Sequence, residues 1–579
     1  MSTAKVSFAS SPLLASKTPL WRSRLLVVLL GLAFVGLGAR AAWVQVVHQE
    51  FYQKQGDVRF ARTLEIPAER GRLLDRDGVV LAANVPAVSV WAIPEDVNTA
   101  TLDHPEKLVE LSRVLGLTLP DLQKKLVQED RSFVWLRRQM DSPVRAQIEA
   151  LGILGVYMRT EARRQYPEGE AATQLTGFIN ADGKGIEGLE MVFNQHLSGQ
   201  AGSRRVLKDR MGRVVEDVGD QVLAVDGHDI HLTVNHKIQF FAYQQLKEAV
   251  QMHRAKSGSA VVLDAQTGEV LALVNADGTG SDAKTTRNRA LVDSFEPGSV
   301  MKPLTIGLAL ERGLVNPLST FQTAPGAIMI GSAKITDSHA HGVLTVNQII
   351  QKSSNVGTVK IALQMPAAAM WEFYSQVGLG QKPALPFPGI VSGRLRHPKN
   401  WQRVEQATMS YGYGLSVSLF QLAQAYSVLA NDGVLVAPHL IRKEGAAPMA
   451  SQRIMSAANA QAVRHMLQLA AGAEGTAPLA QVEGYTVGGK TGTSHKSEGK
   501  KGYAAKRYRS TFVGMSPIDH PRIVVAISID EPSNGRYFGG EVAAPVFSKT
   551  VGTTLRLLGV QPDRTVKPQI AVNAVEEST

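Results

Sequence analysis

Three short motifs, far apart in this 579-residue chain, carry the residue types needed for acyl transfer through a serine. They read SVMK at 299–302, SSN at 353–355 and KTGT at 490–493. Together they supply a hydroxyl with a lysine three residues later, a second hydroxyl with an amide, and a cation beside a glycine. Each motif alone is weak evidence, but the three in this order predict a single acyl-transfer site.

Ser299 is the predicted nucleophile. Pro297 and Gly298 precede it and an apolar helical pattern follows, so the serine should lie at or near the N-terminus of a helix, where Pro303 is tolerated in the first turn. Lys302 should project from the same helix face. If burial lowers its pKa, the neutral amine can take the serine proton. An N-cap serine with an exposed lysine is the alternative for an isolated motif of this kind.

The second motif is expected in a loop between two helices, because polar residues there separate two apolar stretches. Ser353 is a candidate to relay a proton to the leaving amine. Asn355 is a candidate to hold a substrate amide or to steady Lys302. A simple turn or helix cap is the alternative for this motif taken alone.

The third motif is expected on a strand, along which a peptide substrate could pair through its main chain. Gly492 would let that backbone come close. The N–H groups of Thr493 and Ser299 could form an oxyanion hole, and Lys490 with the hydroxyls of Thr491 and Thr493 could hold a terminal carboxylate. A phosphate-binding loop is the competing interpretation of this glycine-rich segment. We disfavour it because no glycine stands five residues ahead of Lys490, as we expect the GxxxxGK[ST] spacing to require.

Composition limits the class of protein. The length suggests two or three folded units, and 44% hydrophobic with 20% charged residues is ordinary for a globular chain. Residues 1–49 contribute +5 of the net charge of +11, which leaves +6 for the other 530 residues, and no basic helix with interleaved aromatic residues is present, so we expect no nucleic-acid partner. The absence of cysteine excludes disulfides and thiolate metal sites.

Residues 25–47 are predicted to form a transmembrane helix, because about 20 apolar residues cross a bilayer. Basic residues precede the span, so residues 1–24 should stay in the cytoplasm and the rest should be exported to the periplasm. Arg40 can snorkel and Trp43 suits the interface. A cleaved signal peptide is the alternative. The apolar run is long for one, and Arg40 is unfavourable at the cleavage site.

The remaining pattern predicts an α+β fold. Asp77-Gly78 within residues 70–82 indicates a hairpin whose charges lock it to a neighbour. Residues 103–151 are expected to be helical, and a second domain is expected to begin near residue 230. Its strands at both ends of the sequence, with helices between them, predict an antiparallel sheet flanked by helices. The strands expected there are 259–264, 270–274, 508–515 and 523–529, with a helix over 543–558.

Two further segments are candidate functional sites. Asp337, His339 and His341 could suggest a metal site, but a solvated loop is the favoured interpretation. Residues 496–509 carry six basic residues and one acid, and they could guide an acidic glycan–peptide polymer.

The chain resembles a class B penicillin-binding protein, most closely the division-specific type. The resemblance rests on the three motifs and on residues 70–82, 55–57 and 411–414, and it extends from the membrane helix to about residue 560. Position 390 lacks the acidic residue often found in the family. A bifunctional class A enzyme is disfavoured, because no glycosyltransferase domain is expected before the pedestal.

The resemblance implies a pedestal for partner contacts over residues 48–229 and a transpeptidase domain over 230–562, with a five-stranded antiparallel sheet like that of serine β-lactamases. A C-terminal tail, 563–579, would follow. It implies acylation of Ser299 by the D-Ala-D-Ala end of a stem peptide, cross-linking by a neighbouring amine, and acylation by β-lactams, with no cofactor and no metal. The implied partners are a membrane-embedded SEDS-type glycosyltransferase and other divisome proteins.

Two alternatives remain open beside septal cross-linking. An elongation-specific relative would share the chemistry and differ in partners. A β-lactam sensor or scaffold would be acylated without turnover. A β-lactamase is less expected, because no carboxylate is evident that would activate a deacylating water.

Overall fold

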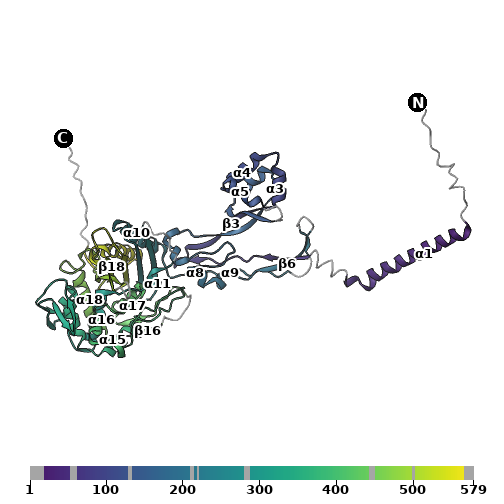
Figure 1. The fold of residues 1–579 in the computed structure, drawn as a ribbon. Helices are drawn as coiled ribbons and strands as arrows, with labels where there is room; N and C mark the ends of the chain where they lie inside the picture. Colours follow the sequence, from purple (N-terminus) through teal and green to yellow (C-terminus); the bar gives the residue numbers. More distant parts are fainter. Residues whose placement is uncertain are drawn as a thin grey trace, which may run out of the picture. The chain divides into compact units, whose positions relative to one another are not determined.

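The computed structural model describes residues 19–51, 61–127, 133–208, 214–217, 221–278, 287–442, 450–497 and 502–565 (Figure 1). Its first element, α1 (Leu20–Ala42), continues into a π-helical turn, η2 (Trp43–Val47), and its side chains are exposed. Within the described part of the chain, Leu20–Val47 is the one helix long and apolar enough to cross a membrane. The predicted span 25–47 lies inside it.

The chain separates into two compact units. The first unit comprises Met1–Ala68 and Gln200–Asp226. Its strands are β1 (Ala61–Ile66), β6 (Gly202–Lys208) and β7 (Val214–Asp217), which form an antiparallel sheet in the order β1-β6-β7. Residues 55–57, which contributed to the family resemblance, lie outside the described residues.

The N-terminal part of the second unit is built on one long strand, β3 (Val80–Ala92), which pairs with β4 (Val134–Asp141) and β5 (Val156–Gln165). The helices α3 (Pro94–Thr101), α4 (Pro105–Leu115), α5 (Leu119–Leu126) and α6 (Val144–Leu151) contribute to a hydrophobic cluster with these strands. The expectation that residues 103–151 form helices is therefore confirmed by α4, α5 and α6 and wrong at β4. Pairing with β3 stabilises a strand there, and β-branched and aromatic residues such as Val134 and Trp135 suit it.

The predicted hairpin at 70–82 is confirmed. Strand β2 (Leu73–Leu74) turns through Asp77 and Gly78 into β3, and Gly78 takes a positive φ of 84°. The Asp75 carboxylate accepts hydrogen bonds from the backbone N–H groups of Asp77 and Val79, both at 2.8 Å, which fixes the turn. Ion pairs to neighbouring segments are present as expected: Arg70–Glu190, Arg72–Asp229 and Arg76–Glu269. Asp75 makes a hydrogen bond of 2.6 Å with the His236 ring.

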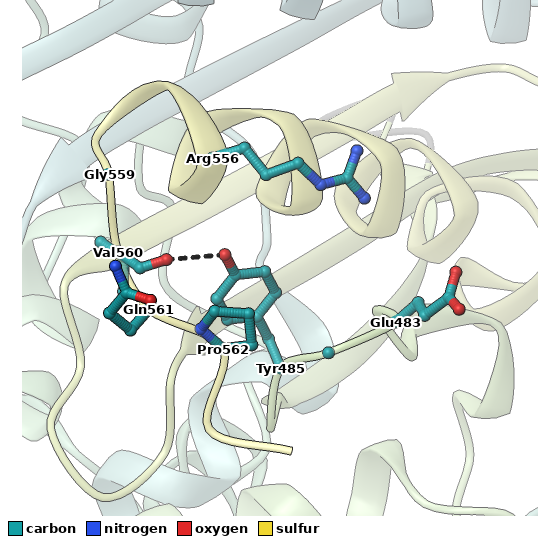
Figure 2. Close-up of a pocket in the computed structure, with 8 residues that line it drawn as sticks. Glu483, Tyr485, Arg556, Gly559, Val560, Gln561 and Pro562 are labelled. Carbon is teal, nitrogen blue, oxygen red and sulfur yellow. Dashed lines mark hydrogen bonds between the residues drawn. The ribbon is translucent and has the colours of Figure 1, made fainter. Parts of the chain in front are cut away.

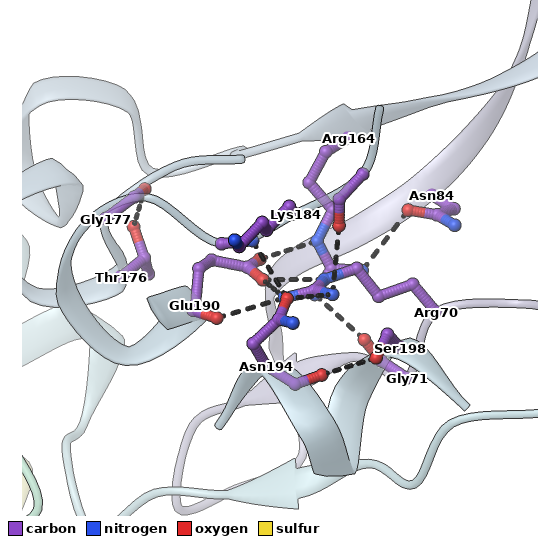
Figure 3. Close-up of polar contacts among 12 residues, drawn as sticks. Arg70, Gly71, Asn84, Arg164, Thr176, Gly177, Lys184, Glu190, Asn194 and Ser198 are labelled. Atoms are coloured by element: carbon purple, nitrogen blue, oxygen red, sulfur yellow. Dashed lines mark hydrogen bonds and ion pairs between the residues drawn. The ribbon is translucent and has the colours of Figure 1, made fainter. Parts of the chain in front are cut away.

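Glu190 is the centre of a buried ion-pair network near this hairpin (Figure 3). Its carboxylate accepts hydrogen bonds from the guanidinium groups of Arg70 at 2.8 Å and Arg164 at 2.7 Å. Arg164 also donates to the Gly71 carbonyl at 2.8 Å, and Arg70 donates to Asn194 at 3.0 Å. Segments more than a hundred residues apart are thereby joined by charge-assisted hydrogen bonds.

The larger sheet of the second unit is antiparallel throughout, in the order β10-β9-β19-β18-β17. Its strands are β9 (Ser257–Asp264), β10 (Val270–Asp277), β17 (Gly488–Ser497), β18 (Tyr503–Ser516) and β19 (Ile523–Asp530). The predicted pairing of the early and late strands is confirmed, because β9 lies next to β19.

The side chains along each strand alternate between two hydrophobic clusters, one on each face of this sheet. Helices cover both faces. Val262 and Val525 point toward α10 (His236–Met252) and α20 (Ala544–Leu557). Val261 and Val524 point toward the opposite face, covered by α17 (Leu419–Ala430) and α18 (Ala457–Ala471), which Figure 1 labels. The α+β fold predicted from the sequence is confirmed.

Shorter elements complete the second unit. The helices are α7 (Thr173–Thr176), α8 (Gly188–Val192), α9 (Asn194–Ser198), α11 (Arg289–Val292), α12 (Lys302–Glu311), α13 (Val346–Gln351), α14 (Asn355–Ala362), α15 (Ala367–Gln376), α16 (Arg403–Ser410) and α19 (Gly539–Val542), with the 3-10 turns η3 (Gly169–Ala171), η4 (Gly298–Met301), η5 (Pro398–Asn400) and η6 (Pro478–Ala480). The strands are β8 (Ile230–His231), β11 (Thr320–Gln322), β12 (Ala327–Ile330), β13 (Ala333–Thr336), β14 (Val343–Thr345), β15 (Val434–Val436) and β16 (Ser451–Arg453).

The buried network gives a stability prediction. Glu190→Ala leaves two buried guanidinium groups without their carboxylate, so the free energy of unfolding should fall by about 3–5 kcal/mol. Glu248→Ala is the control, since Glu248 pairs with Lys549 where both side chains are about half exposed, at 51% and 53%, and it should cost less than about 1 kcal/mol. Denaturant unfolding of both variants measures the difference. Equal losses would contradict a special role for the network.

Candidate active site

Ser299 lies in the 3-10 turn η4, which leads directly into α12. The sequence explains the change of helix type. Pro303 has no N–H to donate to the Ser299 carbonyl in an α-helical ladder, and the Lys302 N–H donates to that carbonyl instead. Ser299 is partly buried at the start of a buried helix, as the preceding Pro-Gly predicts.

Lys302 connects the first motif to the second. Its side chain is fully buried, and its Nζ donates to the carbonyl oxygen of Ser353 and lies 3.1 Å from the Ser353 Oγ. Ser353 lies in the expected loop between α13 and α14, with a positive φ of 60°. With this unusual backbone conformation, the carbonyl oxygen and the Oγ of Ser353 both contact the Lys302 amine.

Glycine brings the third motif against the nucleophile. A Cβ on Gly492 would lie 2.9 Å from the Pro297 carbonyl oxygen and 3.2 Å from Val300, so only glycine lets β17 pass this close to η4. From the other side, a Cβ on Gly298 would lie 3.6 Å from that of Ser494. The structure thus brings all three motifs together, as the sequence predicts.

Two buried lysine amines lie close enough at this site to interact electrostatically. Burial, followed by the positive charge of Lys490, lowers the pKa of Lys302 well below its ordinary value, and the Asp337 carboxylate partly opposes this. Burial lowers the pKa of Lys490 to about 7. Lys302 is thereby suited to act as a neutral base, while Lys490 changes charge near neutral pH.

The threonines of the third motif are held by neighbouring segments. Thr491 Oγ1 lies 2.9 Å from Thr476 Oγ1 and 3.3 Å from the Lys490 Nζ. Thr493 Oγ1 accepts a hydrogen bond from the Gly539 N–H at 3.0 Å. Because β17 is the last strand at this edge of the sheet, an extended peptide can pair alongside it.

Asn355 begins α14, and its side-chain nitrogen donates to the Thr336 carbonyl at 2.7 Å. In the described part of the chain no hydrogen bond joins Asn355 to Lys302. Of the two roles expected from the sequence, this geometry leaves the substrate amide as the one open to Asn355.

Asp337 is a site residue that sequence reasoning missed. It was expected in a solvated loop, but its carboxylate accepts from the Ser354 Oγ at 2.7 Å and from the backbone N–H groups of Asn355 and Val356 at 2.5 and 2.9 Å. It therefore fixes the turn that carries Ser353. No sequence signal identified it, because Asp337 precedes that turn by 16 residues.

No group of residues suited to hold a metal ion occurs in the described ranges.

The phosphate-loop alternative also needs a correction. Residues 484–491 do fit the spacing GxxxxGK[ST]. A phosphate loop would end a strand and open a helix at the lysine, whereas Lys490 lies inside β17. Residues 483–485 instead line a surface pocket with the end of α20 (Figure 2), where the Tyr485 hydroxyl donates to the Val560 carbonyl at 2.8 Å. No residue of the three motifs lines this pocket.

Comparison with known proteins is consistent with this geometry. A family model of the penicillin-binding protein transpeptidase domain matches residues 258–552, and one of the penicillin-binding protein dimerisation domain matches residues 65–232. The chain is 39% identical to the probable peptidoglycan D,D-transpeptidase PenA of Neisseria gonorrhoeae over 551 residues, 93% of this chain and 94% of the relative. It is 37% identical to the peptidoglycan D,D-transpeptidase FtsI of Escherichia coli, covering 94% of this chain and 93% of the relative.

The chain belongs to the class B penicillin-binding proteins. Among solved structures, the transpeptidase domain of penicillin-binding protein 3 from Burkholderia pseudomallei is 50% identical, with a TM-score of 0.55 over 58% of this chain and 98% of that one. Penicillin-binding protein 3 from Mycobacterium tuberculosis, complexed with aztreonam, is 29% identical, with a TM-score of 0.66 over 86% of this chain and 98% of that one.

This class B penicillin-binding protein is a serine-type peptidoglycan D,D-transpeptidase of the FtsI and PenA type. It acts on peptidoglycan and binds β-lactams. Leu20–Val47, the one helix of the described residues that is long and apolar enough to span a bilayer, fits a single-pass protein of the inner membrane.

The pKa of Lys490 gives a prediction on ligand binding. In the free enzyme Lys490 loses its charge as the pH rises through about 7. Above that pH the dissociation constant of a penicillin with a free carboxylate should rise, by up to about tenfold per pH unit. The methyl ester of the same penicillin is the control, and its binding should not change. The concentration dependence of acylation measures both constants. A rise of equal size for acid and ester would contradict a contact between Lys490 and the carboxylate.

Proposed function

We propose that this protein cross-links septal peptidoglycan through an acyl-enzyme on Ser299. The observation that carries the proposal is the buried Lys302 amine, which is three residues from Ser299, in contact with Ser353, and low in pKa. A hydroxyl beside an uncharged amine can be deprotonated as it attacks.

Acylation would proceed as follows. The Ser299 oxygen attacks the carbonyl carbon of the penultimate D-Ala while its proton passes to the Lys302 amine. The developing oxyanion is stabilised by the N–H groups of Ser299 and Thr493. The bond to the terminal D-Ala nitrogen then breaks, Ser353 gives that nitrogen a proton, and Lys302 returns a proton to Ser353. Terminal D-Ala leaves.

Deacylation would run through the same groups in reverse. The amine of a neighbouring stem peptide attacks the ester carbonyl, its proton passes through Ser353 to Lys302, and the Ser299 oxygen leaves with a proton from Lys302. In substrate binding, Lys490 and the hydroxyls of Thr491 and Thr493 would hold the terminal carboxylate. The substrate backbone would pair with the strand at Gly492, and Asn355 would hold a substrate amide.

The septal assignment is supported by 37% identity with FtsI over nearly the whole chain. We further propose that residues 1–24 lie in the cytoplasm, that 25–47 cross the membrane, that 48–229 form a pedestal, and that 230–562 carry out the reaction in the periplasm, followed by a tail at 563–579. A SEDS-type glycosyltransferase and other divisome proteins are the proposed partners, and the pedestal is the part proposed to contact them.

Labelling tests the nucleophile. Ser299→Ala should abolish covalent labelling by a fluorescent penicillin, with no adduct in the intact mass. Ser353→Ala is the graded control, because it keeps the nucleophile and should slow labelling by about a hundredfold, the range of a lost proton relay. Peptide mapping of the wild-type adduct should place it on Ser299. An adduct that persists in Ser299→Ala would refute the assignment.

Depletion in the source cell tests the biological role. Loss of the protein should block septation and give filaments, because elongation continues while septal cross-linking stops. The wild-type gene should restore division and Ser299→Ala should not. Rounded cells would indicate the elongation-specific role instead, and rescue by Ser299→Ala would indicate a scaffold without turnover.

A further inference from the structure

A tyrosine outside the three motifs holds the carbonyl next to the nucleophile. Tyr426 lies in α17 and is fully buried, and its hydroxyl donates to the Val300 carbonyl oxygen at 2.7 Å. The two residues are 126 positions apart in the sequence. This bond therefore joins α17, which packs on one face of the sheet, to η4, the turn that carries Ser299.

The Val300 carbonyl lacks the donor that a 3-10 turn would supply, because of the residue that follows Lys302. In a 3-10 turn a carbonyl is satisfied by the N–H three residues later. For Val300 that position is Pro303, which has no N–H. A buried carbonyl without a partner costs free energy, and the Tyr426 hydroxyl removes that cost. Burial raises the pKa of Tyr426 well above its ordinary value, so the hydroxyl stays protonated and able to donate.

The same turn is fixed at two other points. The Gly298 N–H donates to the Gly412 carbonyl at 3.1 Å, and Gly492 packs against Pro297 and Val300. Both contacts restrain the turn from the side of the cleft. Tyr426 restrains it from the side of the core.

We propose that Tyr426 is a positioning residue for the transpeptidase reaction. Its hydrogen bond to Val300 holds η4, the turn that carries Ser299, in its 3-10 conformation where it leads into the helix that begins at Lys302. Without that bond the turn would be free to shift, and the Ser299 oxygen would sample the attacking geometry less often. This inference rests on Ser299 being the nucleophile, as proposed above.

Tyr374 provides a matched control on the same nucleophile helix. It is also a fully buried tyrosine, and its hydroxyl lies 2.7 Å from Thr305 Oγ1, which in turn donates to the Ser410 carbonyl. Thr305 lies within α12, beyond Lys302. Tyr374 itself lies in α15, so Tyr374→Phe removes one buried hydroxyl that contacts the body of α12 and leaves the Val300 contact intact.

The experiment separates binding from chemistry. With a β-lactam as the probe, Tyr426→Phe should lower the first-order acylation constant by about tenfold, with the noncovalent dissociation constant unchanged within about twofold. Tyr374→Phe should leave the acylation constant within about twofold of wild type, at a comparable loss of thermal stability. Equal effects of the two variants on acylation, or no effect of Tyr426→Phe, would overturn the proposal.

A second variant keeps the test decisive if Tyr426→Phe alone folds poorly. Pro303→Ala restores an N–H that can donate to the Val300 carbonyl, three residues earlier, or to the Ser299 carbonyl, four residues earlier, so Pro303→Ala alone is the reference for this comparison. On the Pro303→Ala background, adding Tyr426→Phe should therefore lower the acylation constant by less than about threefold. A full tenfold loss on that background would contradict the hydrogen bond as the cause. Labelling of wild-type Ser299 is measured in parallel, so that failure here is distinct from failure of the proposed nucleophile.

Discussion

Two buried lysines, Lys302 and Lys490, stand close enough in one cleft that the charge of one lowers the pKa of the other. A charged amine loses its hydration on burial, and two like charges in a medium of low dielectric constant raise the cost further. The cleft therefore favours a state in which Lys302 is neutral. The proposed chemistry at Ser299 depends on that state, because an ammonium group cannot accept a proton.

The fold around the cleft provides what this arrangement requires. The antiparallel sheet places β17 at its edge, and glycine at 492 lets that strand approach the nucleophile turn. The Asp337 carboxylate fixes the turn that carries Ser353, and the Tyr426 hydroxyl holds the carbonyl after Ser299. None of these residues adds a reactive group. They fix the distances over which proton transfer can occur.

Local sequence patterns predicted much of the fold. Short, nearly continuous apolar runs identified β9, β10 and β19, and Asp77-Gly78 identified the hairpin. They failed at β4, where the pairing partner β3 lies about fifty residues earlier in the chain and outweighs the helical expectation. They also failed at Asp337, because a carboxylate in a polar loop looks solvent-exposed until the helix that it caps is in place.

The sequence by itself determined the chemical inventory: a serine and a lysine one helical turn apart, a hydroxyl with an amide, and a cation beside a glycine. That spacing is local, so helix geometry alone puts Ser299 and Lys302 on one face. Only the tertiary structure decided that Ser353 contacts Lys302, that Lys490 lies close by, and that Tyr426 supplies the donor that Pro303 cannot. Protonation was also decided there, because a pKa follows from burial and neighbouring charges, which exist only once distant segments have packed together.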